Sequence, residues 1–230
     1  MCHAVGVPAY DAVLFDWSGT LVHDPPPRDR LVRALQLLDR DLDREAVDAL
    51  LAGLDTAGLL PEVEAAMIDE DTSAERHRAA NLLHFERAGL DPDLAEMLYR
   101  FDHEACHRPL YPDAPATLTA LRAHDVKIAV VSDIHLDIRV LLDGQGVGTM
   151  VDAYVLSFEH GCQKPDPAMF RIALELLEVD AERALMVGDR CSHDGGSVAA
   201  GVAAFILPPP PPVLTARGLE TVARIVGFEP

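Results

Sequence analysis

The stretch Ala12-Val13-Leu14-Phe15-Asp16-Trp17-Ser18-Gly19-Thr20 decides the fold of this chain. Its first four residues are apolar without alternation, which predicts a strand over residues 12–16 that is buried on both faces. The Ser-Gly-Thr turn ends that strand and places Asp16 at its carboxyl end. A carboxylate in this position can attack an electrophile as a nucleophile.

Comparable apolar runs occur again in the second half of the sequence. Helical patterns separate them, and the clearest begins at Asp166, a capping residue, with Pro167 in the first helical position. Alternating strands and helices predict an α/β fold with a doubly wound, Rossmann-like parallel sheet and right-handed crossovers. The four later strands are expected at Lys127–Ser132, Ala153–Ser157, Ala184–Gly188 and Ala203–Leu207, and a last helix at 213–226.

Residues 22–106 differ from the rest of the chain because their apolar residues repeat with helical spacing and no strand pattern is apparent. Further periodic stretches cover residues 74–88 and 92–105. We therefore expect a helical cap of residues 22–106, inserted into an α/β core of residues 1–21 and 107–230. Long insertions in a loop are tolerated because loop-closure entropy grows slowly with length.

The composition limits the function classes. Of the 230 residues, 49% are hydrophobic, which argues against disorder, and the net charge of −19 disfavours nucleic acid and anionic membranes as partners. The longest apolar run, Val198–Leu207, is too short to span a bilayer, and the four cysteines form no close pair. We expect a cytoplasmic protein. The run Pro208–Pro212 is expected to be a stiff spacer before the last helix, with docking to a partner as the less favoured alternative.

Polar residues follow the ends of several predicted strands. In a parallel sheet these ends lie at one edge, where ligands bind. Two acids facing the carboxylate of Asp16 would repel it unless a cation such as Mg²⁺, which prefers hard oxygen ligands, lay between them. A hydroxyl and an ammonium group would suit the oxygens of a transferring phosphoryl group. The residues concerned are Asp16, Ser132, Asp133, Lys164, Asp189, Arg190 and Asp194.

In this order and spacing, the motifs at 16–20, Ser132, Lys164 and 189–194 resemble those of the haloacid dehalogenase superfamily. The resemblance implies a phosphatase for a small phosphorylated substrate, in which Asp16 forms an aspartyl-phosphate that water then hydrolyses. It further implies roles for the remaining site residues. Mg²⁺ would be held by Asp16, the backbone carbonyl of Ser18, Asp189 and Asp194. The phosphoryl group or the nucleophile would be positioned by Thr20, Ser132 and Lys164. Further candidate contacts to phosphate are Gly19, Asp133 and Arg190.

Position 18 departs from the family pattern. Family phosphatases usually carry a second Asp there, which serves as acid for the leaving group and as base for water, whereas this chain has Ser18. General acid–base catalysis is commonly worth about 10²–10⁴ in rate. A surrogate such as His23 or His193, a good leaving group, or different chemistry would be needed. For His23, His135 and His193 themselves, an exposed and non-catalytic position is the favoured expectation.

Several alternatives stay open or are set aside. Phosphonatases share Asp-Trp and Gly-Thr in the first motif but need a cap lysine, and residues 22–106 contain none, so that activity is rejected. Haloacid dehalogenases work without metal, and an acid at Asp189 argues against them. A catalytically weak relative that binds a ligand or a protein is the second hypothesis. A two-component receiver domain, which also forms a phospho-aspartate, is disfavoured by the long insertion. Cap loops around 55–72 are expected to set the specificity, while the substrate and the oligomeric state stay open.

Overall fold

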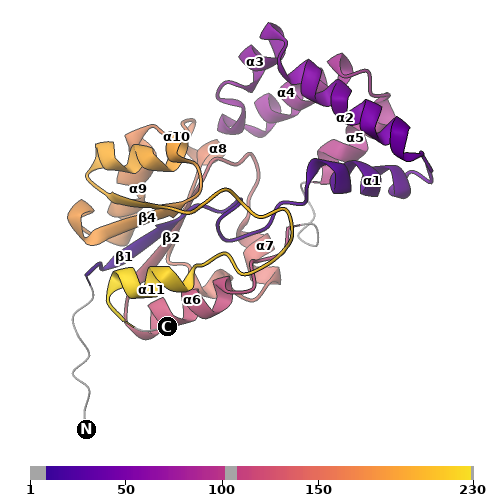
Figure 1. Cartoon of the computed structure of the whole chain (residues 1–230). Coiled ribbons are helices and arrows are strands. Elements are labelled where there is room, and N and C mark those ends of the chain that lie inside the picture. The colour runs from indigo at the N-terminus through magenta and orange to yellow at the C-terminus, as the bar shows by residue number, and fades with distance from the viewer. Residues whose placement is uncertain (1–8, 102–107, 229–230) are drawn as a thin grey trace.

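A computed structural model describes residues 9–101 and 108–228. Its centre is a sheet of five parallel strands in the order β3-β2-β1-β4-β5 (Figure 1). β1 lies in the middle, and its residue Phe15 is in register with Val130 of β2 and Val187 of β4. The strands span Ala12–Phe15 (β1), Lys127–Ser132 (β2), Ala153–Leu156 (β3), Ala184–Gly188 (β4) and Ala203–Ile206 (β5).

Helices cover both faces of the sheet, as predicted for a doubly wound fold (Figure 1). Side chains alternate along β1, so Val13 and Phe15 belong to one apolar core and Ala12 and Leu14 to the other. The first core is closed by α6 (Ala114–Ala123), α7 (Arg139–Gly144) and α11 (Glu220–Val226), and the second by α9 (Pro167–Leu177). Short helical turns at α8 (Ser157–His160), α10 (Cys191–Asp194), η3 (Gly148–Met150), η4 (Ala181–Arg183) and η5 (Gly195–Ala200) complete this part.

The remaining helices gather away from the sheet (Figure 1) and lie within the expected insertion of residues 22–106. They have a core of their own, in which Leu31, Phe85 and Leu98 are buried together. No strand lies within the described residues 27–101. Residues 102–106, the end of the expected insertion, fall outside the described residues. The elements are α1 (Pro27–Leu37), α2 (Arg44–Gly58), α3 (Pro61–Met67), η1 (Glu70–Thr72), α4 (Ala74–Arg87) and α5 (Pro92–Phe101).

The start of α9 is set by neighbouring residues, whereas the start of α11 is set by a contact with a residue distant in the sequence. Asp166 caps α9 as predicted, because its carboxylate accepts the N–H of Ala168 and Pro167 opens the helix. The prediction of a last helix from 213 was wrong, since α11 begins at Glu220. Gly218 has φ +88°, and the carboxylate of Asp113 accepts three successive backbone N–H groups at 217–219, so the chain turns there instead.

No helix among the described residues combines the length and the apolar character that crossing a membrane requires.

Candidate active site

The site lies at the carboxyl edge of the sheet, where three neighbouring strands end. Asp16 follows β1, Ser132 ends β2, and Asp189 follows β4. The register of the three strands brings these ends level with one another. Lys164 enters from the loop between α8 and α9, which crosses the same edge.

Lys164 is the centre of a buried ion cluster. Its Nζ donates to Oδ1 of Asp16 at 2.7 Å and to Oδ1 of Asp194 at 2.6 Å, and all three side chains are almost wholly shielded from solvent. Burial alone would lower the pKa of Lys164, but the carboxylates of Asp16 and Asp194 raise it above its ordinary value. Burial raises the pKa of Asp16, and Lys164 opposes that shift. The lysine is therefore charged, and it balances one of two buried carboxylates.

Asp194 also shapes the loop that follows β4. Its Oδ2 accepts the backbone N–H groups of Asp189 at 3.1 Å and Arg190 at 2.9 Å. A Cβ on Gly188 would approach this carboxylate to 2.2 Å, so only glycine permits the carboxylate to lie there. Asp194 thus holds both Lys164 and the backbone of residue 189.

The acidic groups are arranged to receive a hard cation. One carboxylate oxygen from each of Asp16, Asp189 and Asp194 lies within 4.8 Å of the others. Oδ2 of Asp16 and Oδ1 of Asp189 are buried without a hydrogen-bond partner in the described part of the chain. Burial, together with the charges of Asp16 and Asp194, raises the pKa of Asp189 to about 6. These orphaned oxygens fit an Mg²⁺-like ion, which would relieve their repulsion.

Gly19 makes the closest backbone approach in the site. Its φ is +73°, and an added Cβ would lie 2.7 Å from Oδ2 of Asp189 and 2.9 Å from Pro210. Its carbonyl oxygen accepts from Nε of Arg217 at 2.6 Å, and the same guanidinium donates to the carbonyl of Pro208 at 2.5 Å. The run Pro208–Pro212 is therefore more than the expected spacer, because it also packs against the turn that follows Asp16.

The other predicted site residues gather at the same edge. Thr20 and Ser132 are buried, and Ser132 Oγ makes only a long contact of 3.5 Å with the carbonyl of Asp133. Asp133 accepts the backbone N–H of Lys164 at 2.8 Å. Arg190 lies 3.6 Å from the carboxylate of Asp133 and also borders the cleft.

The expectation of exposed histidines was wrong for His23 and His135, which are buried, and His193 is half-buried. His23 is 7% exposed and packs edge-on against Tyr111, and His135 is 3% exposed. His193 shares a hydrogen bond with the hydroxyl of Ser192 at 2.9 Å. Of these three, only His135 lines the cleft that contains Ser18.

Asp24 is a site residue that the sequence analysis missed. The hydroxyl of Ser18 donates to its Oδ2, and Nε of Arg108 lies 3.3 Å from its Oδ1. Asp24 follows a short turn in which Gly19 N–H donates to the carbonyl of Val22, and this turn returns the chain to residue 18. No spacing or composition signal in the sequence indicates such a return.

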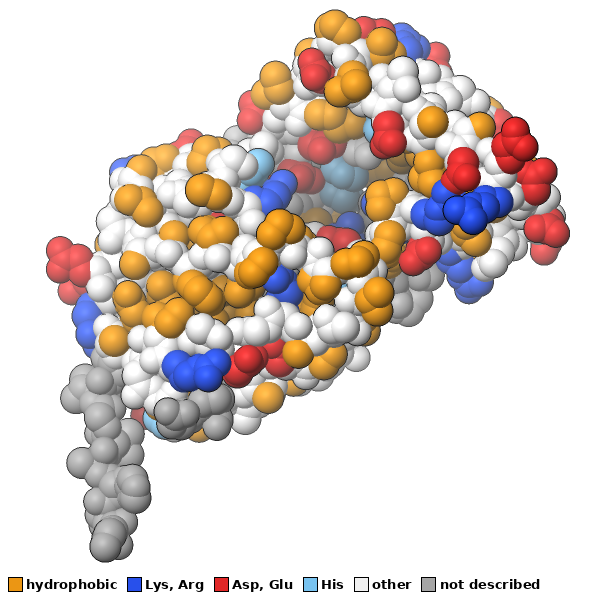
Figure 2. All heavy atoms as spheres, viewed as in Figure 1, with side chains coloured by type: hydrophobic (Ala, Val, Ile, Leu, Met, Phe, Trp, Pro, Cys, Tyr) orange, Lys and Arg blue, Asp and Glu red, His pale blue; other side chains and the backbone are white. Residues whose placement is uncertain are grey.

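The cleft between the sheet edge and the helical insertion gives access to the site. Its cavity of about 250 Å³ is lined by Ser18, Asp189 and Arg190 from the core and by Asp71 and His77 from the insertion. Figure 2 shows the hollow between the two parts, with acidic, basic and histidine side chains gathered inside it. Specificity from the loops around 55–72 stays a prediction, although Asp71 places part of that range at the cleft.

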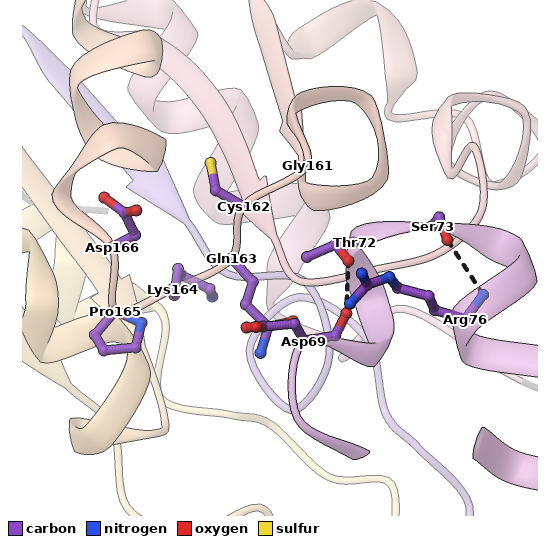
Figure 3. Close-up of a pocket in the computed structure, with 10 residues that line it drawn as sticks. All are labelled: Asp69, Thr72, Ser73, Arg76, Gly161, Cys162, Gln163, Lys164, Pro165 and Asp166. Carbon is purple, nitrogen blue, oxygen red and sulfur yellow. Dashed lines mark hydrogen bonds between the residues drawn. The ribbon is translucent and has the colours of Figure 1, made fainter. Parts of the chain in front are cut away.

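A second cavity of about 660 Å³ is lined in part by the loop that carries Lys164. There the loop Gly161–Asp166 faces the segment Asp69–Arg76 of the insertion (Figure 3). Thr72 donates to the carbonyl of Asp69, and Ser73 accepts from the backbone of Arg76, so the segment is held by its own hydrogen bonds.

Known proteins with similar sequences and folds indicate the family of this chain. The model for the hydrolase family described as haloacid dehalogenase-like hydrolase matches residues 10–200. A phosphoglycolate phosphatase of Rhodospirillum rubrum is 32% identical over 204 residues, which cover 85% of this chain and 78% of that protein. A phosphatase structure from Thermococcus onnurineus is 24% identical with a TM-score of 0.61 and covers 95% of this chain and 99% of its own. A 2-haloacid dehalogenase structure from Pseudomonas syringae is 27% identical with a TM-score of 0.58 and covers 86% of each chain.

Proposed function

Because the chain belongs to the haloacid dehalogenase-like hydrolases, we propose that it is a divalent-cation-dependent phosphatase, with Mg²⁺ as the expected ion and a small phosphorylated metabolite as substrate. One observation supports this most directly. Asp16, Asp189 and Asp194 converge beside the ammonium of Lys164 and leave buried carboxylate oxygens without hydrogen-bond partners in the described chain. Such a site favours a cation and the oxyanion of a phosphate ester together.

Asp16 is the proposed nucleophile. Lys164 holds the Asp16 carboxylate through Oδ1. One oxygen of this carboxylate forms a bond to phosphorus while the ester P–O bond breaks, and the electron pair of the broken bond leaves with the alcohol oxygen, which takes up a proton. Water then attacks the phosphorus of the aspartyl-phosphate, loses a proton, and releases inorganic phosphate with Asp16 restored.

Asp16 and Asp189, with Asp194 and the backbone carbonyl of Ser18 as further candidates, would hold the ion. A bound Mg²⁺ supplies positive charge that neutralises the phosphoryl oxygens and the carboxylates around them. Ser132, Lys164 and the N–H groups of the turn after Asp16 are suited to orient the phosphoryl group.

Proton transfer is assigned to Asp24 in place of the acid that Ser18 replaces. A serine hydroxyl exchanges protons poorly near neutral pH, but here it donates to a carboxylate that can do so. His23 and His193, the surrogates suggested by the sequence, do not line the cleft, whereas Asp24 does. Asp24 would protonate the leaving group and then accept a proton from the attacking water.

Hydrolysis of a panel of phosphate esters by the purified protein, with Mg²⁺ and after chelation, tests the proposal. We expect turnover that requires the ion and is abolished by Asp16→Asn. Activity that survives Asp16→Asn would refute the assigned nucleophile. Absence of turnover on every ester, together with a large gain in Ser18→Asp, would favour the alternative of a weakly catalytic binding protein.

Two further measurements separate the remaining options. Asp24→Asn should lower kcat by about 10²–10⁴ if it transfers protons, and by much less if it only orients Ser18. Release of halide from 2-haloacids without metal would instead support the dehalogenase alternative. The acids at 189 and 194 gather beside Asp16 and argue against that outcome. Burial and the charge of Asp194 raise the pKa of Asp16, which disfavours a charged nucleophile when no cation is bound.

A further inference from the structure

A second group of metal-binding side chains spans the cleft between the insertion and the core. Asp71 in η1 and His77 in α4 come from the insertion, and His135 comes from the loop that follows β2. None of them belongs to the acidic group around Asp16, although all three line the same cleft.

The three side chains converge on one point. Oδ1 of Asp71 lies 3.9 Å from Nε2 of His77 and 3.5 Å from Nδ1 of His135, and one ligand atom from each residue lies within 4.8 Å of the others. Around a tetrahedral ion with bonds of about 2.0–2.1 Å, neighbouring ligand atoms are roughly 3.3–3.4 Å apart. The observed separations exceed that value by an amount that side-chain rotation can remove.

The backbone around the group is fixed from both sides by one side chain. Ser157, which is fully buried, donates its hydroxyl to the carbonyl oxygen of Asp71 at 2.6 Å and accepts the N–H of Ile134 at 2.8 Å. This hydroxyl therefore ties η1 of the insertion to the residue that precedes His135. The two histidines are also largely buried, at 9% and 3% exposed, so the place where they meet Asp71 is shielded from bulk solvent.

The donor set selects a different class of ion from the acidic group around Asp16. Two imidazoles and one carboxylate suit zinc and related borderline ions, with the fourth position open to water, whereas three carboxylates suit Mg²⁺. The rings of His77 and His135 are stacked, with centroids 3.3 Å apart and an angle of 7°. An ion lies in the plane of each imidazole that it binds, so binding requires one ring to turn out of the stack.

We propose that Asp71, His77 and His135 bind a zinc-class divalent ion that clamps the insertion to the core across the catalytic cleft. Because the ligands come from both the insertion and the core, the ion stabilises the arrangement in which these two parts lie against each other. Bound ion would then slow entry of substrate and release of product, a consequence that rests on the proposed phosphatase function, while ion binding itself does not.

Cobalt titration of the full chain tests the site without any substrate. The protein is stripped with a chelator, returned to millimolar Mg²⁺ to fill the acidic group, and titrated with Co²⁺ while the visible bands of a four-coordinate ion are recorded. We expect one Co²⁺ per chain, bound more than about tenfold more weakly by His77→Gln and by His135→Gln. His160→Gln, at an exposed histidine that ends α8, is the matched control and should bind as the unaltered protein does.

Asp71→Asn is the milder variant should a histidine variant unfold, because it keeps the backbone contact to Ser157 and loses only the carboxylate charge. Binding that persists in Asp189→Asn supports a separate site. Binding that is lost in Asp189→Asn but unchanged in the two histidine variants would overturn the proposal. For the clamp, Zn²⁺ should lower turnover at saturating Mg²⁺, and His77→Gln should relieve the inhibition. Zinc that binds yet leaves turnover unchanged would refute the clamp.

Discussion

Replacing Lys164 by Met tests whether the buried ammonium is what allows two carboxylates to lie inside the core. The variant keeps the length of the side chain and removes its charge. Both ion pairs of Lys164, at 2.7 and 2.6 Å, are then lost while Asp16 and Asp194 stay buried. We expect a less stable protein without phosphatase activity.

The magnitude follows from the geometry. At an effective dielectric constant of about 20, each pair at this separation attracts by roughly 6 kcal/mol, and the desolvation of the ammonium opposes much of that attraction. Removing one partner of a buried pair commonly destabilises by about 3–5 kcal/mol, because a buried charge is left uncompensated. We therefore expect the free energy of unfolding to fall by about 3–5 kcal/mol at pH 7.5 without divalent ions.

Urea unfolding followed by circular dichroism measures the change. The loss should be smaller at pH 5, because burial raises the pKa of Asp16 and protons then neutralise part of its charge, and smaller again with Mg²⁺ present. Lys127→Met is the matched control, since Lys127 is the other lysine of the sequence and is exposed at the start of β2. A loss below about 1 kcal/mol at pH 7.5, or a loss that does not depend on pH, would refute the reasoning.

Three further predictions follow from single contacts. Gly19→Ala should lower kcat by about 10² at saturating Mg²⁺, because the new methyl group meets Asp189 and Pro210; steady-state kinetics with unchanged kcat would contradict this. Burial raises the pKa of Glu70 to about 7 from its ordinary 4.5, so the folded state loses stability as the pH rises between these values. Glu70→Gln should therefore stabilise by about 1 kcal/mol at pH 8, discounted for partial exposure, and not at pH 4, as thermal unfolding at both pH values would detect. Asp113→Ala should destabilise by about 1–2 kcal/mol, since three backbone N–H groups lose their acceptor; equal urea midpoints would disprove that account.

Most of the fold could be predicted because its signals are local. The apolar run before Asp16 and the cap-and-proline start at Asp166 each depend on a few neighbouring residues, and both elements form where expected. The start of α11 could not be predicted, because the turn before it is held by Asp113, about a hundred residues earlier in the chain. A local pattern carries no information about such a contact.

The same distinction between sequence signals and packing contacts applies to the residues of the candidate site. Asp16 and Asp189 could be placed together from the sequence because they follow parallel strands, whose carboxyl ends lie at one edge of the sheet, and Lys164 because its loop follows a third strand. Asp24 and His77 could not, since their positions depend on how a turn and a helical insertion pack over that edge. The buried state of His135 likewise depends on packing against the insertion.

The central place of β1 in the sheet has a consequence for how the chain is made. Residues Ala12–Phe15 are synthesised before both of their partner segments, which are Lys127–Val130 and Ala184–Val187. The helices of residues 27–101 contact one another over shorter sequence separations than those strands, so they can assemble before β2 is synthesised. Until β2 is synthesised, this apolar strand is a segment that molecular chaperones can bind.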